Sequence, residues 1–126
     1  MKSRTLLVTL ALASLATFGA ACEGGEPTGA TCPDGSTLTY ASFGEQFMAD
    51  YCVMCHSSTA EDRHGAPKSA NFDTIEEIRA KADDIDSAAG KGPSASNDWM
   101  PDSASVAFPT ATEREQLAEW LACGAP

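Results

Sequence analysis

Tyr51-Cys52-Val53-Met54-Cys55-His56 is the stretch around which the chain is organised. Two thiols separated by two residues and followed at once by a histidine form the C-x-x-C-H motif. In this motif each sulfur attaches to one haem vinyl group, and the histidine binds the iron. We therefore expect one covalently bound haem c, attached at Cys52 and Cys55, with His56 as an axial ligand.

Three other interpretations of these residues are open. A thioredoxin-like redox pair also shows C-x-x-C, but it needs a cysteine at a helix start after a βαβ-type strand, and the residues before Cys52 have a helical pattern. A zinc site could use Cys52 and Cys55 with His64 or His56, although a second ligand pair at a matching spacing is missing. A simple Cys52–Cys55 disulfide leaves the adjacent His56 unexplained.

Residues 1–21 have the pattern of a secretory signal peptide. Lys2 and Arg4 precede an apolar run, and small residues lead up to Cys22. The run is too short for a membrane span. We therefore expect an exported, periplasmic protein. Cys22 also resembles the lipid-bearing cysteine of bacterial lipoproteins, although Gly19 stands where that family usually has Leu. Lipidation of Cys22 would anchor the protein to a membrane, whereas ordinary cleavage after Ala21 would leave it soluble.

The charge of the chain bears on its partners. The sequence has 8 Lys and Arg against 18 Asp and Glu, a formal charge of −10. Loss of Lys2 and Arg4 with the signal peptide would leave 6 basic residues against 18 acidic ones, or −12. This excess of negative charge argues against nucleic acid as a partner. It suits a redox partner protein with a basic docking face, or it serves only solubility.

The cysteines outside the motif are Cys22, Cys32 and Cys123. If Cys22 carries lipid, Cys32 and Cys123 are left to form a disulfide across the chain ends. Such a bond lowers the entropy of the unfolded chain and would stabilise the fold by roughly 4 kcal/mol. The alternative pair is Cys22 with Cys32, which leaves Cys123 free.

Three helices are expected in the haem domain, residues 37–126. The first, about 42–54, begins at a Ser42–Glu45 capping box. The second, about 74–89, has Asp73 as its expected N-cap and solvated acidic residues along one face. The third runs from a Thr110–Glu113 capping box to about residue 122. Residues 22–36, rich in Gly, Pro and Thr, are expected to be a tether and a turn with no core.

The loop 91–109 is too long to be a neutral connector in so small a domain. It contains Met100, flanked by Trp99 and Pro101, which we expect to brace it. A soft thioether suits haem iron, so Met100 is the predicted ligand opposite His56. The alternative is a methionine packed on the porphyrin edge without ligation.

The remaining candidates are assigned mainly structural roles. Met48 lies one turn before Cys52 and is expected in the core, as is Trp120. His64 is expected to be a solvated loop histidine. A backbone carbonyl in the turn at Pro67 is expected to accept the hydrogen bond of the other His56 ring nitrogen.

From about Leu38 onward the chain resembles the monohaem class I cytochromes c. The resemblance rests on residues 52–56 and on weaker matches, which are Gly44, Phe47, 65–67, Met100-Pro101, Leu117 and Trp120-Leu121. It implies an all-α fold of three to four helices around one haem, with the first and last helices crossing near the glycine. Cys32 and the Cys123 tail depart from the simplest members and suggest a disulfide-braced variant.

The expected function is electron transfer by a His/Met-ligated haem. Two strong ligands leave no open site on the iron, and they allow it to gain or lose one electron with little change in geometry. The protein would then be an electron carrier and not itself an enzyme, whether or not it serves as a subunit of an oxidoreductase. The alternatives are a haem enzyme or gas-binding module with an open iron site, and a lipid-anchored interaction protein.

Overall fold

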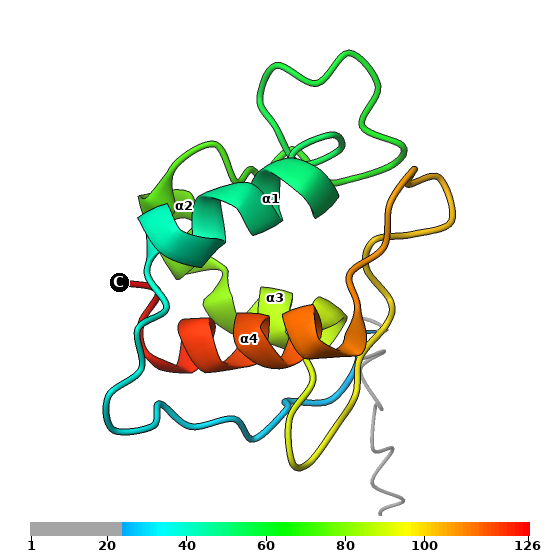
Figure 1. Ribbon diagram of the computed structural model, residues 1–126. Coiled ribbons are helices and arrows are strands. Elements are labelled where there is room, and N and C mark those ends of the chain that lie inside the picture. The colour runs from blue at the N-terminus through cyan, green and yellow to red at the C-terminus, as the bar shows by residue number, and fades with distance from the viewer. Residues whose placement is uncertain (1–23) are drawn as a thin grey trace, which may run out of the picture.

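The computed structural model describes residues 24–126 and shows helices joined by long loops (Figure 1). The elements are the π-helical turn η1 (Tyr40–Gly44), α1 (Glu45–Tyr51), α2 (Ile75–Ala80), α3 (Ala82–Ala89) and α4 (Ala111–Ala122). The described residues contain no β-strand, only an isolated bridge between Lys91 and Ser96. The all-α class is therefore confirmed for this part of the chain. The predicted signal peptide and Cys22 lie outside it.

None of the helices in residues 24–126 is long and apolar enough to cross a membrane.

The first helix begins earlier and ends earlier than the sequence pattern predicts. Thr39 is the N-cap, and its side chain accepts a hydrogen bond from the Ser42 N–H at 3.1 Å while the Ser42 hydroxyl accepts from the Thr39 N–H at 2.9 Å. The capping box is therefore Thr39–Ser42, and the predicted Ser42–Glu45 box is wrong. Helix α1 ends at Tyr51, so Cys52 directly follows its last turn.

The second expected helix is divided into two. Lys81 separates α2 from α3, with φ −120° and ψ 14°, outside the helical range. Thr74 caps α2 in a box with Glu77, so the prediction of Asp73 as N-cap is wrong. Asp73 instead accepts a hydrogen bond from the Ser58 N–H at 2.8 Å, which fastens the loop after the attachment motif to the start of α2.

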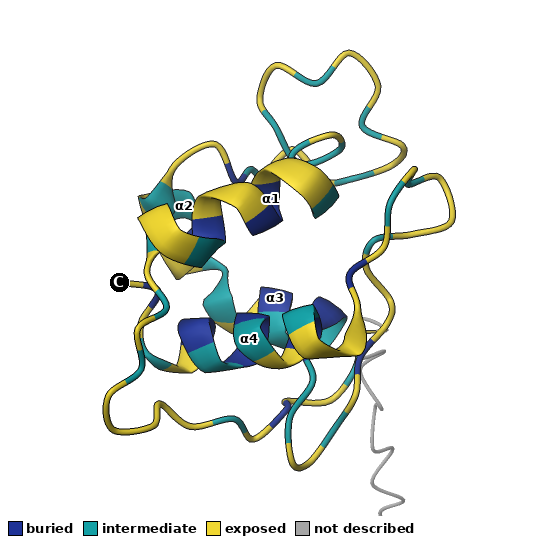
Figure 2. Cartoon of the chain, viewed as in Figure 1, coloured by how far each residue is buried: buried dark blue, intermediate teal, exposed yellow. Residues whose placement is uncertain are grey.

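Helix α4 matches its prediction closely. Thr110 and Glu113 form the expected capping box, and the helix ends at Ala122. It packs against α3. Inward-facing residues of all four α-helices contribute to the core, and Figure 2 shows the buried parts of α1, α3 and α4 in dark blue. The largest core side chains are those of Phe47, Met48, Phe72, Ile78, Ile85, Leu117, Trp120 and Leu121.

Gly44 allows the start of α1 to lie directly on α4. A Cβ atom at this position would be 2.3 Å from Cζ2 of Trp120, closer than real Cβ contacts. Trp120 is fully buried and packs edge-on against Phe43, with ring centroids 6.0 Å apart. The expected core positions of Trp120 and Met48 are confirmed.

The segment before η1 contains one buried residue, Thr28, so the expectation that it contributes nothing to the buried interior is wrong at that position; residues 31–35 are exposed, and the predicted turn is present at Asp34-Gly35. Thr28 is fully buried, and its hydroxyl and N–H donate to the Asp86 carboxylate at 2.7 and 2.9 Å. Asp86 thus is not part of the solvated face expected for α3. Asn97 donates from Nδ2 to the Glu26 carbonyl at 2.7 Å. The segment is therefore held to α3 and to the loop that follows it.

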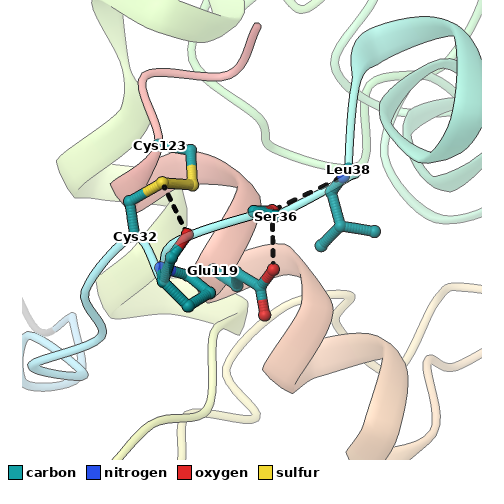
Figure 3. Close-up of a disulfide and its surroundings, with 6 residues drawn as sticks. Cys32, Ser36, Leu38, Glu119 and Cys123 are labelled. Carbon is teal, nitrogen blue, oxygen red and sulfur yellow. Dashed lines mark hydrogen bonds between the residues drawn. A yellow bond between two sulfur atoms is a disulfide. The ribbon is translucent and has the colours of Figure 1, made fainter.

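A disulfide joins the packed segment to the end of α4. Cys32 and Cys123 are bonded, with Cα atoms 4.6 Å apart, so the pairing predicted across the chain ends is present (Figure 3). Nearby, the Ser36 hydroxyl donates to the Glu119 carboxylate at 2.7 Å. The Tyr40 N–H donates to the Pro126 carbonyl at 2.6 Å. The two ends of the domain are thus fastened by one covalent bond and two hydrogen bonds.

Candidate functional site

A cavity of about 380 Å³ lies beside the end of α1 and extends to α3. Its lining is mostly apolar and comes from four parts of the chain: the C-x-x-C-H motif with Tyr51, the 63–72 loop, α3 with the preceding Lys81, and the 100–105 segment. Cys52, Cys55, His56 and Met100 all line it. The structure therefore brings together the four residues that the sequence predicts as haem attachment points and axial ligands.

The His56 ring is fixed in the cavity by a hydrogen bond and by stacking. Its Nδ1 lies 2.9 Å from the Ala70 carbonyl oxygen. Because a carbonyl only accepts, Nδ1 carries the proton and Nε2 keeps a free lone pair, which is the form that binds a metal. The ring also stacks on Phe72, with centroids 4.6 Å apart and planes 20° from parallel.

The carbonyl that accepts from His56 comes from the end of the proline turn. The sequence led to the Pro67 region, and the structure assigns the contact to Ala70, whose own N–H donates to the Pro67 carbonyl at 2.9 Å. Pro67 therefore closes the turn that aims the Ala70 carbonyl at His56. Residues 67–70 provide the expected acceptor, three residues later than the proline itself.

The two thiols of the motif have raised pKa values. Burial raises the pKa of Cys52 to about 12, although the nearby Arg114 charge opposes this rise. Burial also raises the pKa of Cys55, assisted by the negative charges of Asp102 and Asp62. Cys52 and Cys55 are not disulfide-bonded in the structure. Both shifts disfavour the thiolate form that a thioredoxin-like pair needs.

Met100 is held in place through its backbone. Its N–H donates to the Ala88 carbonyl of α3 at 3.0 Å, and its carbonyl accepts from Nη1 of Arg114 at 2.8 Å. Trp99, expected to brace Met100, is 55% exposed. Pro101 lines the cavity beside Met100. Two backbone contacts, one to α3 and one to α4, thus keep Met100 beside the cavity.

Arg114 is a site residue that the sequence interpretation missed. It is 8% exposed, and its Nη1 also donates to the carbonyls of Ala89 at 2.9 Å and Asn97 at 3.0 Å. Burial lowers its pKa below the usual value. A signal was present in the sequence, because position 114 lies one helical turn before Leu117 on the buried face of α4. A charged residue in that stripe indicates an inward-facing hydrogen-bonding role.

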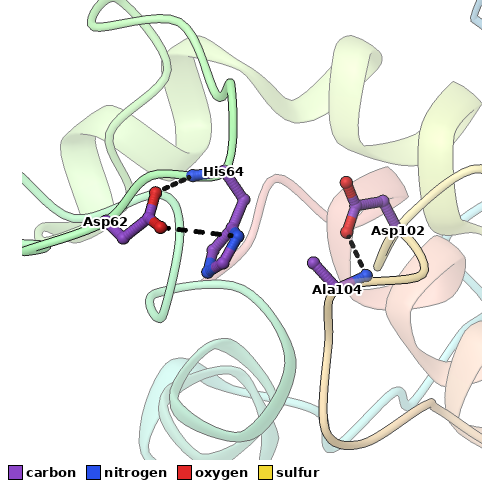
Figure 4. Close-up of polar contacts among 4 residues, drawn as sticks. All are labelled: Asp62, His64, Asp102 and Ala104. Carbon is purple, nitrogen blue, oxygen red and sulfur yellow. Dashed lines mark hydrogen bonds and ion pairs between the residues drawn. The ribbon is translucent and has the colours of Figure 1, made fainter.

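Two loops border the cavity and carry polar side chains that face each other (Figure 4). On one side are Asp62 and His64, whose Nδ1 lies 3.8 Å from the Asp62 carboxylate. On the other is Asp102, which accepts from the Ala104 N–H at 2.8 Å. His64 is exposed, as expected of a solvated loop histidine, but it also lines the cavity.

The described residues hold no group of three or more His, Cys, Asp or Glu side chains placed to bind a metal ion. Cys22, the candidate for lipidation, lies outside residues 24–126.

Comparison of the chain with protein-family models, with curated proteins and with solved structures gives no match.

Proposed function

We propose that this protein is an electron carrier that holds one haem c covalently at Cys52 and Cys55, with His56 and Met100 as axial ligands. Under this proposal the domain is a disulfide-braced relative of the class I cytochromes c. The bound haem would supply reversible one-electron oxidation and reduction at its iron. The described residues would bind it, orient it and keep water away from it.

One observation carries the proposal. The attachment motif and Met100 are far apart in the sequence, yet they line the same mostly apolar cavity. This fits the group, because the cavity falls within the range of roughly 300–1,000 Å³ that is usual for ligand and cofactor sites. The free Nε2 of His56 and the thioether of Met100 are the donor atoms that a haem iron with two axial ligands needs.

Each residue has a distinct task in the proposal. Cys52 and Cys55 tie the group to the end of α1. His56 is kept in its metal-binding tautomer by Ala70. Met100 is kept within reach by its backbone contacts to α3 and α4. Fixed ligands reduce the rearrangement that accompanies each electron transfer.

The proposal extends to partners and compartment. The acidic chain suits a redox partner with a basic docking face, and the sequence signals suit export to the periplasm, with membrane attachment if Cys22 is lipidated. Attachment of haem to both thiols would also account for two cysteines that line the cavity and are not disulfide-bonded in the structure.

The test is the visible spectrum of protein matured in a periplasm that attaches haem. The wild type should give a c-type spectrum with a sulfur-to-iron charge-transfer band. Met100→Ala should lose this band and bind carbon monoxide when reduced. Met54→Ala is the matched control, because Met54 is also 40% exposed but does not line the cavity.

Three outcomes would contradict the proposal in different ways. A band that survives in Met100→Ala would exclude Met100 as the ligand. Ready carbon monoxide binding by the native protein would favour a haem enzyme or gas-binding module with an open site. A mature chain without covalent haem would overturn the proposal as a whole.

A further inference from the structure

Arg63 occupies the centre of the loop that follows the attachment motif. Its guanidinium donates to four backbone carbonyls: Ser57, Ala66 at 3.2 Å, Pro67 at 2.8 Å and Ala70 at 3.2 Å. It also lines the cavity. Within residues 24–126 it forms no ion pair with a carboxylate. Its direct contacts are therefore to carbonyl dipoles, and its charge also helps to lower the pKa of Asp73.

One of these four carbonyls is the acceptor of His56. The Ala70 oxygen receives Nδ1–H of His56 at 2.9 Å and Nη2–H of Arg63 at 3.2 Å. A carbonyl oxygen has two lone pairs, so these two donors fill it. A cationic donor withdraws electron density from the oxygen, which weakens the competing bond from His56.

The strength of the His56 bond bears on the metal-binding nitrogen. A strong acceptor on Nδ1–H makes the imidazole more electron-rich at Nε2, and a weak acceptor makes it less so. An electron-poor ligand stabilises the oxidised metal less than the reduced one. A fixed positive charge beside the cavity acts in the same direction, because it favours the state with one more electron.

We propose that Arg63 is a positioning residue that raises the reduction potential of the group bound at His56, through the Ala70 carbonyl that the two side chains share. This inference rests on the proposed function and assigns it a tuning element. Arg63 acts on His56 in two ways, through the shared Ala70 carbonyl and through its positive charge. Its hydrogen bonds all go to backbone carbonyls, so the same side chain also orders the 57–70 loop.

Arg79 provides a matched control. It also donates to a backbone carbonyl, that of Ala125, from Nε at 3.0 Å and Nη2 at 2.8 Å. It does not line the cavity. Replacing Arg79 therefore removes the same charge and the same kind of contact away from His56.

The experiment compares haem-loaded wild type, R63Q, R63K and R79Q at fixed pH and ionic strength. Optical redox titration gives the potential, and the charge-transfer band reports the Met100 ligand. R63Q should shift the one-electron equilibrium about tenfold toward the oxidised form, a fall of 59 mV. R63K should fall by less, because it keeps the charge. R79Q should match the wild type.

A second readout separates tuning from loop order. In the reduced, diamagnetic protein the Nδ1–H proton resonance of His56 should move downfield in R63Q, because the bond to Ala70 strengthens when its competitor is removed. A variant that merely loosens the loop would lengthen this bond and move the resonance upfield.

The outcomes distinguish this inference from the function on which it rests. A wild-type protein that takes no haem overturns both. A haem-loaded wild type with R63Q at the same potential overturns only the role of Arg63. If R63Q does not take haem, R63K decides: a lowered potential supports the inference, and a wild-type potential overturns it.

Discussion

Removing the Cys32–Cys123 disulfide should destabilise this domain severely without changing its native structure. The bond joins residues 91 positions apart in the sequence. For a closed loop of this length the chain-entropy relation gives about 4.6 kcal/mol of stabilisation at 25 °C. This is a large share of the roughly 5–15 kcal/mol by which a domain is usually stable.

The native structure should persist because other contacts hold the same ends together. The Ser36 hydroxyl remains bonded to Glu119 (Figure 3), and the Tyr40 N–H remains bonded to the Pro126 carbonyl. Cys32 is exposed, so its replacement opens no cavity in the core. The free energy of unfolding therefore falls because the unfolded chain gains conformational entropy when the loop is opened.

The assay is urea unfolding of C32A/C123A followed by helical circular dichroism. The free energy of unfolding should fall by about 3–5 kcal/mol, and the melting temperature by about 20 °C, since each kcal/mol moves a domain of this size by about 4–8 °C. Wild type treated with a thiol reductant should match the variant, because the reductant opens the Cys32–Cys123 bond, whereas the thioether bonds of the proposed haem would resist it. A loss below about 1 kcal/mol would refute the loop-closure reasoning.

Three further predictions concern single side chains. R114M should cost about 2–4 kcal/mol in urea unfolding, because it leaves buried carbonyls unpaired, and in the haem-loaded protein of the proposed function it should also weaken the Met100 charge-transfer band; R114K should show smaller changes in both measurements. Gly44→Ala should lower the melting temperature, because its Cβ would overlap Trp120 and overpacking costs about 1–3 kcal/mol, so an unchanged value would contradict the packing. Hydrogen bonds at the α4 N-terminus lower the pKa of Glu113, so its carboxylate stabilises the fold above its unfolded pKa and the gain is lost as pH falls through the folded value. The difference in melting temperature between wild type and E113Q should therefore shrink from pH 7 toward pH 3, and a constant difference would contradict this assignment.

The sequence pattern predicted helix boundaries correctly where the interacting groups are neighbours in the sequence. Helix α4 is the best example, because Thr110 and Glu113 are three residues apart and bond within the first turn. The same logic gave a wrong start for α1, since Ser42 fits two overlapping boxes and Thr39 is the partner that it uses. The break at Lys81 has no comparable local signal, because the apolar stripe runs through it.

The carbonyl partners of the two cavity arginines could not be predicted. Arg114 bonds the loop of Met100, and Arg63 bonds the carbonyl that orients His56. Backbone carbonyls are present at every residue, so the sequence does not show which of them an arginine will reach. The burial of Arg114 was readable from its position on the apolar face of α4, but its acceptors were not.

By itself the sequence determined the C-x-x-C-H motif, the all-α class of residues 24–126 and the approximate helices, and it predicted Met100 as a partner for His56. These follow from short-range spacing and from the chemistry of each side chain. Only the tertiary structure decided that Cys32 pairs with Cys123, that Thr28 is buried against Asp86, and which backbone groups hold the cavity residues. Those contacts join segments far apart in the chain, and they form only when the packed core fixes the segments beside one another.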